Sequence, residues 1–324
     1  MSGIKIPRSW DIRESEAVPE EVYLNRRKFL RKLGETGMTV AGLYLTSGMF
    51  GLPRAWAETP RGAKTPAKKK RGSAKLLPPS GEAVTPDRLI TRYNNFYEFG
   101  DDKAEIWRLA KGLRADGWTV KVSGLTQKPR TLDVGDLLRK MPLEDRIYRL
   151  RCVETWSAVI PWTGFPLKEL VRILEPLSSA RYVKFATFLD PNLAPGQKER
   201  FWEPWPYTEG LSMEEAMHEL AFVATGMYGH PLTPQNGAPI RLAVPWKYGF
   251  KSLKSIAAIE FAREPPDTFW QSVSPLEYDF PANVDPNVPY ARWDQRFERP
   301  LGQEEMRPTR LYNGYAEQVA RLYA

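Results

Sequence analysis

The sequence predicts an α+β protein, in which short strands mix with separate helices instead of alternating with them. Several stretches alternate apolar and polar residues, which is typical of half-buried strands. Two others repeat apolar residues at helical spacing or begin with a helix cap. The 324 residues include 29 prolines and 23 glycines and show no strand–helix–strand periodicity. The chain is therefore expected to be rich in loops.

Five segments are expected to be strands. They are residues 118–122, 147–153, 183–187, 240–244 and 256–261. The first and third of them alternate apolar and polar side chains most clearly. The second would end in the segment that carries the single cysteine.

Two helices are expected between these strands. The first begins at Pro166, because apolar residues follow it at positions 167, 170, 171 and 174. The second begins at Ser212, which forms a capping box with Glu215, and is expected to run to about Phe222. Residues 264–308 are rich in proline and aromatic residues without periodicity, so they are expected to form an irregular wrapping segment.

The N-terminus carries the pattern of an export signal. Two adjacent arginines, Arg26 and Arg27, are followed by an aromatic residue and a leucine, which is the twin-arginine pattern. Residues 33–52 are apolar but contain an acidic residue and five glycines, so they would span a membrane poorly. A small–x–small pattern then ends at Ala57. We expect residues 1–57 to be a twin-arginine signal peptide cleaved near that alanine, and the protein to be periplasmic. An uncleaved signal anchor or a chance amphipathic helix is the alternative.

The charge of the chain is distributed unevenly. The net charge is +8, but residues 1–80 carry +9 and residues 81–324 carry −1. We expect a flexible basic linker at 58–84, because this stretch is rich in lysine, proline, glycine and alanine. The folded catalytic domain would then occupy residues 85–324. Its near-neutral charge disfavours a nucleic-acid partner, which requires a basic face.

The cysteine and histidine content limits the metal chemistry. One cysteine and two histidines exclude a disulfide framework, an iron–sulfur ferredoxin and a Cys-based structural zinc site. The cysteine, Cys152, follows Arg149 and Arg151, and these cations are expected to lower the pKa of its thiol. A thiolate is a soft ligand for a transition metal. One cysteine cannot hold a metal by itself, so the other ligands would come from a cofactor. The alternative is that Cys152 is an ordinary packing residue.

Three further clusters combine polar, aromatic and cationic side chains. Residues 93–99 mix amides, a carboxylate and aromatic rings, and residues 234–241 form an Asn-Gly turn that ends at Arg241. Residues 245–254 interleave three lysines with aromatic rings around a glycine. Together the clusters suit one bulky, planar, anionic cofactor. Trp246 is expected to line its pocket.

Four strings in these clusters resemble those of the periplasmic protein-methionine-sulfoxide reductases, in their molybdopterin-containing catalytic subunit. They are Y-N-N-F-Y-E-F, R-C-V-E-T-W-S, T-P-Q-N-G-A-P and P-W-K-Y-G-F-K. The resemblance runs from the twin-arginine segment to the tail at 313–318. It implies a sulfite-oxidase-like molybdopterin-binding fold, with mixed β-sheets, surrounding helices and long irregular loops. It also implies a molybdenum–molybdopterin cofactor without an attached nucleotide.

The resemblance also assigns roles to individual residues. Cys152 would be the catalytic residue and the protein ligand of the molybdenum. The residues that would contact the pterin are Asn94, Tyr97, Glu98, Thr187, Asn236 and Arg241. The phosphate end would be held by Ser252, Leu253 and Lys254. The family often has Gly-Ile-Lys in this last stretch, so the phosphate fit is where this chain departs from the pattern.

The implied activity is the repair of methionine sulfoxide residues in periplasmic proteins by oxygen-atom transfer. The resemblance implies electrons from a haem-containing membrane partner and the quinone pool, and the chain itself shows no flavin, haem or iron–sulfur signature. Oxidised periplasmic proteins and the twin-arginine export machinery are the other expected partners. Two alternatives stay open. The first is a periplasmic sulfite oxidase-type molybdoenzyme or another S-/N-oxide reductase, and the second is a binding module without enzymatic activity.

Overall fold

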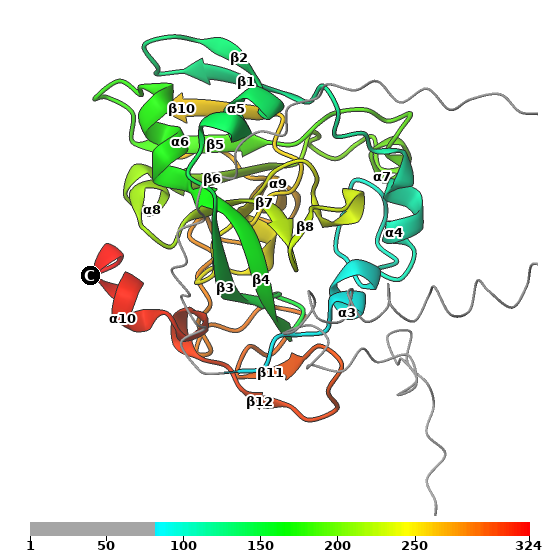
Figure 1. The fold of residues 1–324 in the computed structure, drawn as a ribbon. Helices are drawn as coiled ribbons and strands as arrows, with labels where there is room; N and C mark the ends of the chain where they lie inside the picture. Colours follow the sequence, from blue (N-terminus) through cyan, green and yellow to red (C-terminus); the bar gives the residue numbers. More distant parts are fainter. Residues whose placement is uncertain (1–81) are drawn as a thin grey trace, which may run out of the picture. The chain divides into compact units, whose positions relative to one another are not determined.

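Residues 82–324 are described by the computed structural model, and they are built on two β-sheets (Figure 1). The predicted signal peptide, and the predicted linker up to residue 81, lie outside the described residues. Both therefore stay predictions.

The first sheet has five strands in the order β2-β1-β10-β5-β6. Strands β1 and β10 are parallel, and the other neighbours are antiparallel. Its strands are β1 (Thr119–Gly124), β2 (Arg130–Asp133), β5 (Tyr182–Ala186), β6 (Thr208–Ser212) and β10 (Ala258–Ala262). Three of the predicted strands lie in this sheet.

The second sheet has seven strands and is centred on β4, which pairs with β3, β7 and β11. The pairing of β4 with β11 is parallel, and the other pairs are antiparallel. Its strands are β3 (Glu144–Arg151), β4 (Trp156–Pro166), β7 (Phe222–Met227), β8 (His230–Pro231), β9 (Arg241–Ala243), β11 (Phe297–Pro300) and β12 (Arg307–Pro308). The other two predicted strands, β3 and β9, lie here. Two mixed sheets with separate helices confirm the α+β class.

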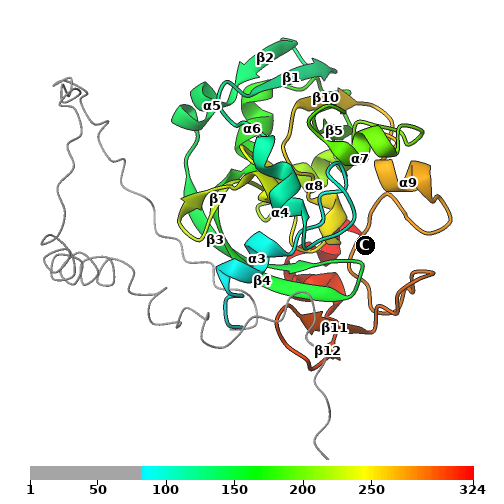
Figure 2. The same cartoon turned by 90° about the vertical axis from the view of Figure 1, so that its right-hand side faces the viewer.

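The helices of the described part are all short. They are α3 (Asp87–Arg92), α4 (Ile106–Leu109), α5 (Val134–Lys140), α6 (Leu167–Leu174), α7 (Pro195–Glu199), α8 (Met213–Met217), α9 (Phe269–Val273) and α10 (Ala316–Val319). Single 3₁₀ turns occur at η3 (Ala110–Gly112), η4 (Pro234–Asn236), η5 (Gly249–Lys251), η6 (Leu311–Gly314) and η7 (Ala320–Leu322). Within residues 82–324, no helix has the length and apolar character needed to cross a membrane. Figure 2 shows β2, β1 and β10 of the first sheet side by side, although β10 is far from the other two strands in the sequence.

The two predicted helices have different outcomes. Helix α6 begins where predicted and buries all four of its expected apolar residues. The capping box of α8 is also confirmed, since Ser212 and Glu215 exchange side-chain hydrogen bonds with each other's backbone N–H groups. The prediction that this helix reaches Phe222 is wrong, because α8 ends at Met217. Phe222 begins β7 instead, where pairing with β4 and β9 buries the strand.

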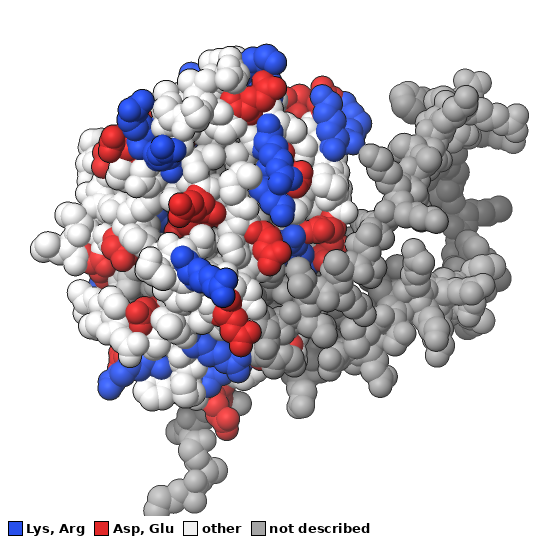
Figure 3. Space-filling model, turned by 90° about the vertical axis from the view of Figure 1, so that its left-hand side faces the viewer, with Lys and Arg blue, Asp and Glu red and all other residues white. Residues whose placement is uncertain are grey.

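Several elements were not predicted, among them one long strand and part of the wrapping segment. Strand β4 is buried along almost its whole length, so it lacks the polar alternation that marks a half-exposed strand. Residues 264–308 are largely irregular as expected, but they also contribute α9, β11 and β12. The face shown in Figure 3 intersperses basic and acidic side chains, in agreement with the near-neutral charge expected for this part of the chain.

Candidate functional site

A cavity of about 690 Å³ brings together segments that are distant in the sequence. Nine of the ten site residues expected from the sequence line it: Asn94, Tyr97, Glu98, Cys152, Asn236, Arg241, Ser252, Leu253 and Lys254. Its volume lies in the range that protein sites use for small molecules and cofactors. The four motifs therefore converge on one site.

Thr187 and Trp246 do not line this cavity. Thr187 lies just beyond β5, and its buried hydroxyl donates to the carbonyl oxygen of Ser255 at 3.1 Å. It therefore holds the backbone next to Lys254 instead of facing the cavity. Trp246 is fully buried, and its indole N–H donates to the hydroxyl of Tyr323 at 2.8 Å. The expectation that Trp246 lines the pocket is wrong.

The segment 93–99 is anchored by its two phenylalanines. Phe96 and Phe99 are buried in a hydrophobic cluster with residues of α4 and η3. This anchoring leaves Asn94, Tyr97 and Glu98 on the cavity wall. The amide nitrogen of Asn94 donates to the Ile90 carbonyl oxygen at 2.8 Å, but its buried Oδ1 has no hydrogen-bond partner among the described residues. A buried acceptor of this kind calls for a donor from a bound molecule.

Cys152 is buried at the end of β3, where the chain turns into β4. The Nδ2 atom of Asn95 lies 3.4 Å from the Cys152 sulfur and 3.1 Å from Glu154 Oε2. That carboxylate oxygen is 3.8 Å from the sulfur, and Lys103 pairs with Glu154 at 3.2 Å. Asn95, Glu154 and Lys103 were not among the expected site residues. The first two stand inside the motif strings, Asn95 next to Asn94 and Glu154 two residues after Cys152.

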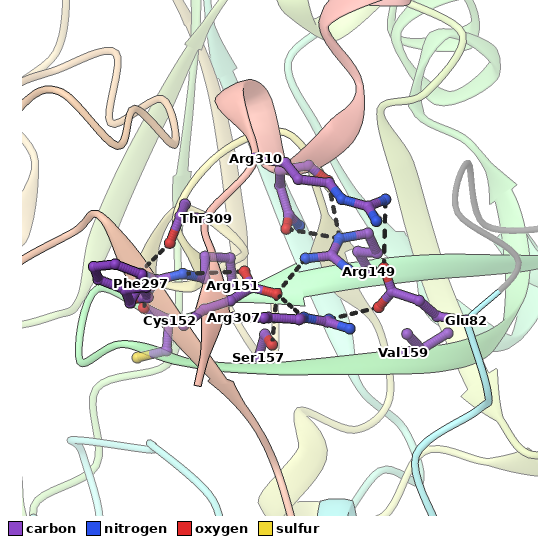
Figure 4. Close-up of polar contacts among 12 residues, drawn as sticks. Glu82, Arg149, Arg151, Cys152, Ser157, Val159, Phe297, Arg307, Thr309 and Arg310 are labelled. Carbon is purple, nitrogen blue, oxygen red and sulfur yellow. Dashed lines mark hydrogen bonds and ion pairs between the residues drawn. The ribbon is translucent and has the colours of Figure 1, made fainter. Parts of the chain in front are cut away.

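The expectation that neighbouring arginines lower the pKa of the Cys152 thiol is wrong. Burial raises this pKa to about 12, the charge of Glu154 adds to the rise, and the charge of Arg151 opposes it. Figure 4 shows the sulfur pointing away from Arg149 and Arg151. Both guanidinium groups pair with Glu298 instead, at 2.5 Å and 3.4 Å. A metal ion bound at the sulfur would supply the positive charge that stabilises the thiolate.

Two cationic side chains, Arg241 and Lys254, also line the cavity. The buried guanidinium of Arg241 donates to the carbonyl oxygens of Leu242, Asn236 and Ser252 at 3.0–3.2 Å, which ties the second and third clusters together. Burial lowers its pKa to about 10. Burial also lowers the pKa of Lys254, and the charge of Arg241 adds to this effect. Two desolvated cations side by side favour an anionic ligand.

The chemistry of the donor set fits the expected cofactor. Residues 82–324 contain no group of three or more His, Cys, Asp and Glu side chains that could hold a metal ion. A metal at Cys152 would therefore take its other ligands from the cofactor. Asn94 offers a free acceptor to a planar polar ring, and Arg241 and Lys254 offer positive charge to a phosphate group.

Comparison with known proteins gives the family. Residues 108–270, half of the chain, match the family described as "Oxidoreductase molybdopterin binding domain". This range contains Cys152 and the second and third clusters, and it begins after the segment 93–99. Among solved structures, the chain is similar to the sulfane dehydrogenase SoxCD from Paracoccus pantotrophus, with 16% identity and a TM-score of 0.40. That match covers 48% of this chain and only 40% of the other. The chain belongs to the oxidoreductase molybdopterin-binding domain family, and its cofactor is a molybdenum–molybdopterin.

Proposed function

We propose that the protein reduces methionine sulfoxide residues in periplasmic proteins. The observation that carries this proposal is the convergence of all four motifs on one cavity around Cys152. The reaction converts a sulfoxide, two protons and two electrons into a thioether and water. When bound, the molybdenum–molybdopterin group supplies the two-electron oxygen-transfer chemistry that no side chain can. Cys152 would hold the metal, and Asn94, Arg241 and Lys254 would bind and orient the cofactor, which we take to lack a nucleotide.

Charge pairing in the cavity wall favours a neutral substrate. Lys103 is neutralised by Glu154 at 3.2 Å, and Arg292 is neutralised by Glu277 at 3.0 Å. All four side chains line the cavity. Sulfite is an anion and would gain from unpaired cations, whereas a sulfoxide is uncharged. The arrangement therefore supports a sulfoxide over sulfite.

Aromatic rings form one wall of the cavity. Tyr97 and Trp270 have ring centroids 5.0 Å apart, and Trp270 and Tyr278 have centroids 5.4 Å apart. All three rings line the cavity. Aromatic faces and edges make favourable contacts with thioether sulfur, which supports a methionine side chain as the product that must fit here.

Exposed apolar side chains lie just outside this wall. Phe201 is 78% exposed and Trp202 is 69% exposed, with ring centroids 5.3 Å apart. Their neighbours Arg200 and Glu203 both bind Tyr97, through its carbonyl oxygen at 2.5 Å and its hydroxyl at 3.0 Å. Exposed apolar patches of this kind mark binding surfaces, and this one would contact a polypeptide that carries the oxidised methionine.

The test supplies the reduced, cofactor-loaded enzyme with an oxidised methionine-rich protein and, separately, with sulfite and an electron acceptor. We expect sulfoxide to be lost from the protein, as measured by mass spectrometry. Sulfite oxidation without any loss of protein sulfoxide would favour the sulfite oxidase alternative. Absence of molybdenum from the exported protein would favour a binding module.

The polypeptide substrate is tested by a double variant, Phe201→Ser with Trp202→Ser. Loss of two apolar contacts is expected to raise KM for the oxidised protein by about tenfold or more, while KM for free methionine sulfoxide stays unchanged. Met306→Ser is the matched control, because Met306 is also an exposed apolar residue, but its neighbour Arg307 pairs with Glu82 and Glu298 instead of contacting Tyr97. An equal rise in KM for both substrates would contradict a polypeptide-binding surface.

Export and electron supply complete the proposal. We infer twin-arginine export to the periplasm from Arg26, Arg27 and the cleavage pattern ending at Ala57. A variant with both arginines changed to lysine should leave a cofactor-loaded precursor in the cytoplasm. Electrons would come from a haem-containing membrane partner that oxidises quinols. Deleting that partner should abolish turnover in cells but not turnover with a chemical reductant.

A further inference from the structure

The loop that carries the cysteine has an unusual backbone. This cysteine loop (residues 152–155) closes on itself through a hydrogen bond from the Thr155 N–H to the Cys152 carbonyl oxygen at 3.0 Å. Thr155 has a φ of +72°, which a β-branched residue rarely adopts. Such a residue persists only when the surrounding structure holds it in place. The contacts that hold this loop therefore decide where the sulfur lies.

Three contacts from outside the loop bind its carbonyl groups. The Arg299 N–H donates to the Thr155 carbonyl oxygen at 2.8 Å, as β11 pairs with the start of β4. The Nε2 atom of Gln295 donates to the Val153 carbonyl oxygen at 2.8 Å. The guanidinium of Arg151 donates to the Cys152 carbonyl oxygen. Two of the three donors come from the wrapping segment.

Gln295 links the loop to a buried network of charges. Its Oε1 accepts a hydrogen bond from Arg151 Nη2 at 2.9 Å, so one fully buried amide joins Arg151 to the Val153 backbone. Arg151 in turn donates to the Thr309 hydroxyl at 3.2 Å and pairs with Glu298. We call the set Glu82, Arg149, Arg151, Glu298 and Arg307 the arginine–glutamate network (Figure 4).

We propose that Gln295 is a positioning residue for Cys152. It transfers the rigidity of the arginine–glutamate network to the cysteine loop and so sets the direction of the sulfur toward the cavity. The inference rests on the proposed role of Cys152 as a metal ligand. A purely structural role would lower stability without changing the environment of the sulfur, so the two roles give different results.

The experiment compares three variants of the full chain. Gln295→Glu keeps an acceptor for Arg151 but loses the donor to Val153, and Gln295→Met loses both. Thr309→Val is the matched control, since it removes another Arg151 contact without touching the loop. The readouts are the alkylation rate of Cys152 in the cofactor-free protein, the Mo(V) electron paramagnetic resonance spectrum of the loaded protein, and the thermal midpoint of each.

We expect both Gln295 variants to change the alkylation rate by about tenfold, the factor that one buried hydrogen bond supplies, and to shift the Mo(V) spectrum. Thr309→Val should change neither the alkylation rate nor the Mo(V) spectrum, even if its thermal midpoint falls as far as those of the Gln295 variants. If Gln295→Met fails to fold, the comparison of Gln295→Glu with Thr309→Val tests the proposal. Alkylation rates and spectra equal to those of Thr309→Val would overturn the proposal. An unaltered metal spectrum in a Cys152→Ser protein would contradict the role of Cys152 as a metal ligand. The alkylation rate is measured without the cofactor, so it tests the positioning of the cysteine loop independently of that role.

Discussion

Replacing Glu298 by glutamine tests the arginine–glutamate network most directly. Its carboxylate is fully buried and lies 2.5 Å from Arg149, 2.7 Å from Arg307 and 3.4 Å from Arg151. Glu82 is the other carboxylate in the network, and it already pairs with Arg149 and Arg307. Without Glu298, Arg151 would lose its carboxylate partner, and Glu82 would be shared by Arg149, Arg307 and Arg310. The new amide N–H groups would also meet further donors.

Removing one partner of a single buried ion pair costs about 3–5 kcal/mol. We therefore expect Glu298→Gln to lower the free energy of unfolding by at least about 3 kcal/mol, a large part of the 5–15 kcal/mol typical of whole proteins. Urea denaturation of the cofactor-free protein measures this loss. Glu169→Gln is the control, because Glu169 pairs with Arg172 at the surface and should contribute only about 0.5 kcal/mol. A loss for Glu298→Gln no larger than that of the control would refute the reasoning.

Three further predictions concern the metal, the cofactor and acid stability. Cys152→Ser should abolish turnover and alter the metal's electronic spectrum while circular dichroism stays unchanged, because oxygen replaces the soft sulfur ligand. Lys254→Met should weaken cofactor retention by about tenfold, measured as bound molybdenum after dialysis, because a charged hydrogen-bond donor is lost. Burial opposes ionisation of Glu215, but Lys247 at 2.5 Å and neighbouring hydrogen bonds lower its pKa below 4.5. As the pH drops below 4.5, the Glu215 carboxylate takes up a proton more readily in the unfolded chain than in the folded protein. Stability should therefore fall as the pH drops from 4.5 toward the pKa of Glu215 in the folded protein. Glu215→Gln should flatten this part of a urea-midpoint curve recorded against pH.

The convergence of the expected residues on one candidate site was largely predictable from the sequence. Nine of the ten expected residues line one cavity, because each motif carries its polar and cationic side chains within a few consecutive positions. The exception, Thr187, is instructive. It lies at the end of a correctly predicted strand, but its hydroxyl is taken by the Ser255 carbonyl oxygen, whose position depends on chain 68 residues further on. Local spacing cannot show which partner a hydroxyl finds.

Burial explains two of the errors in the predicted fold. Strand β4 lacks the alternation of a half-exposed strand because almost all of it is covered. The apolar run at Phe222 was extended from the preceding helix, since a buried strand and a buried helix show similar composition over a few residues. Only pairing with β4 and β9 decides between them.

The sequence alone determined the class of protein. A solitary cysteine excluded metal sites built from several cysteines, and four short motifs indicated a molybdopterin enzyme that the family match over residues 108–270 supports. Such motifs are local, so their chemistry can be interpreted without the fold. The electrostatics of the site required the tertiary structure. Arg149 and Arg151 stand beside Cys152 in the chain, yet they bind Glu298, nearly 150 residues away, while Glu154 and burial set the pKa of the thiol. Adjacent residues in a strand point to opposite faces. A charged side chain next to Cys152 in the sequence therefore need not lie near its sulfur.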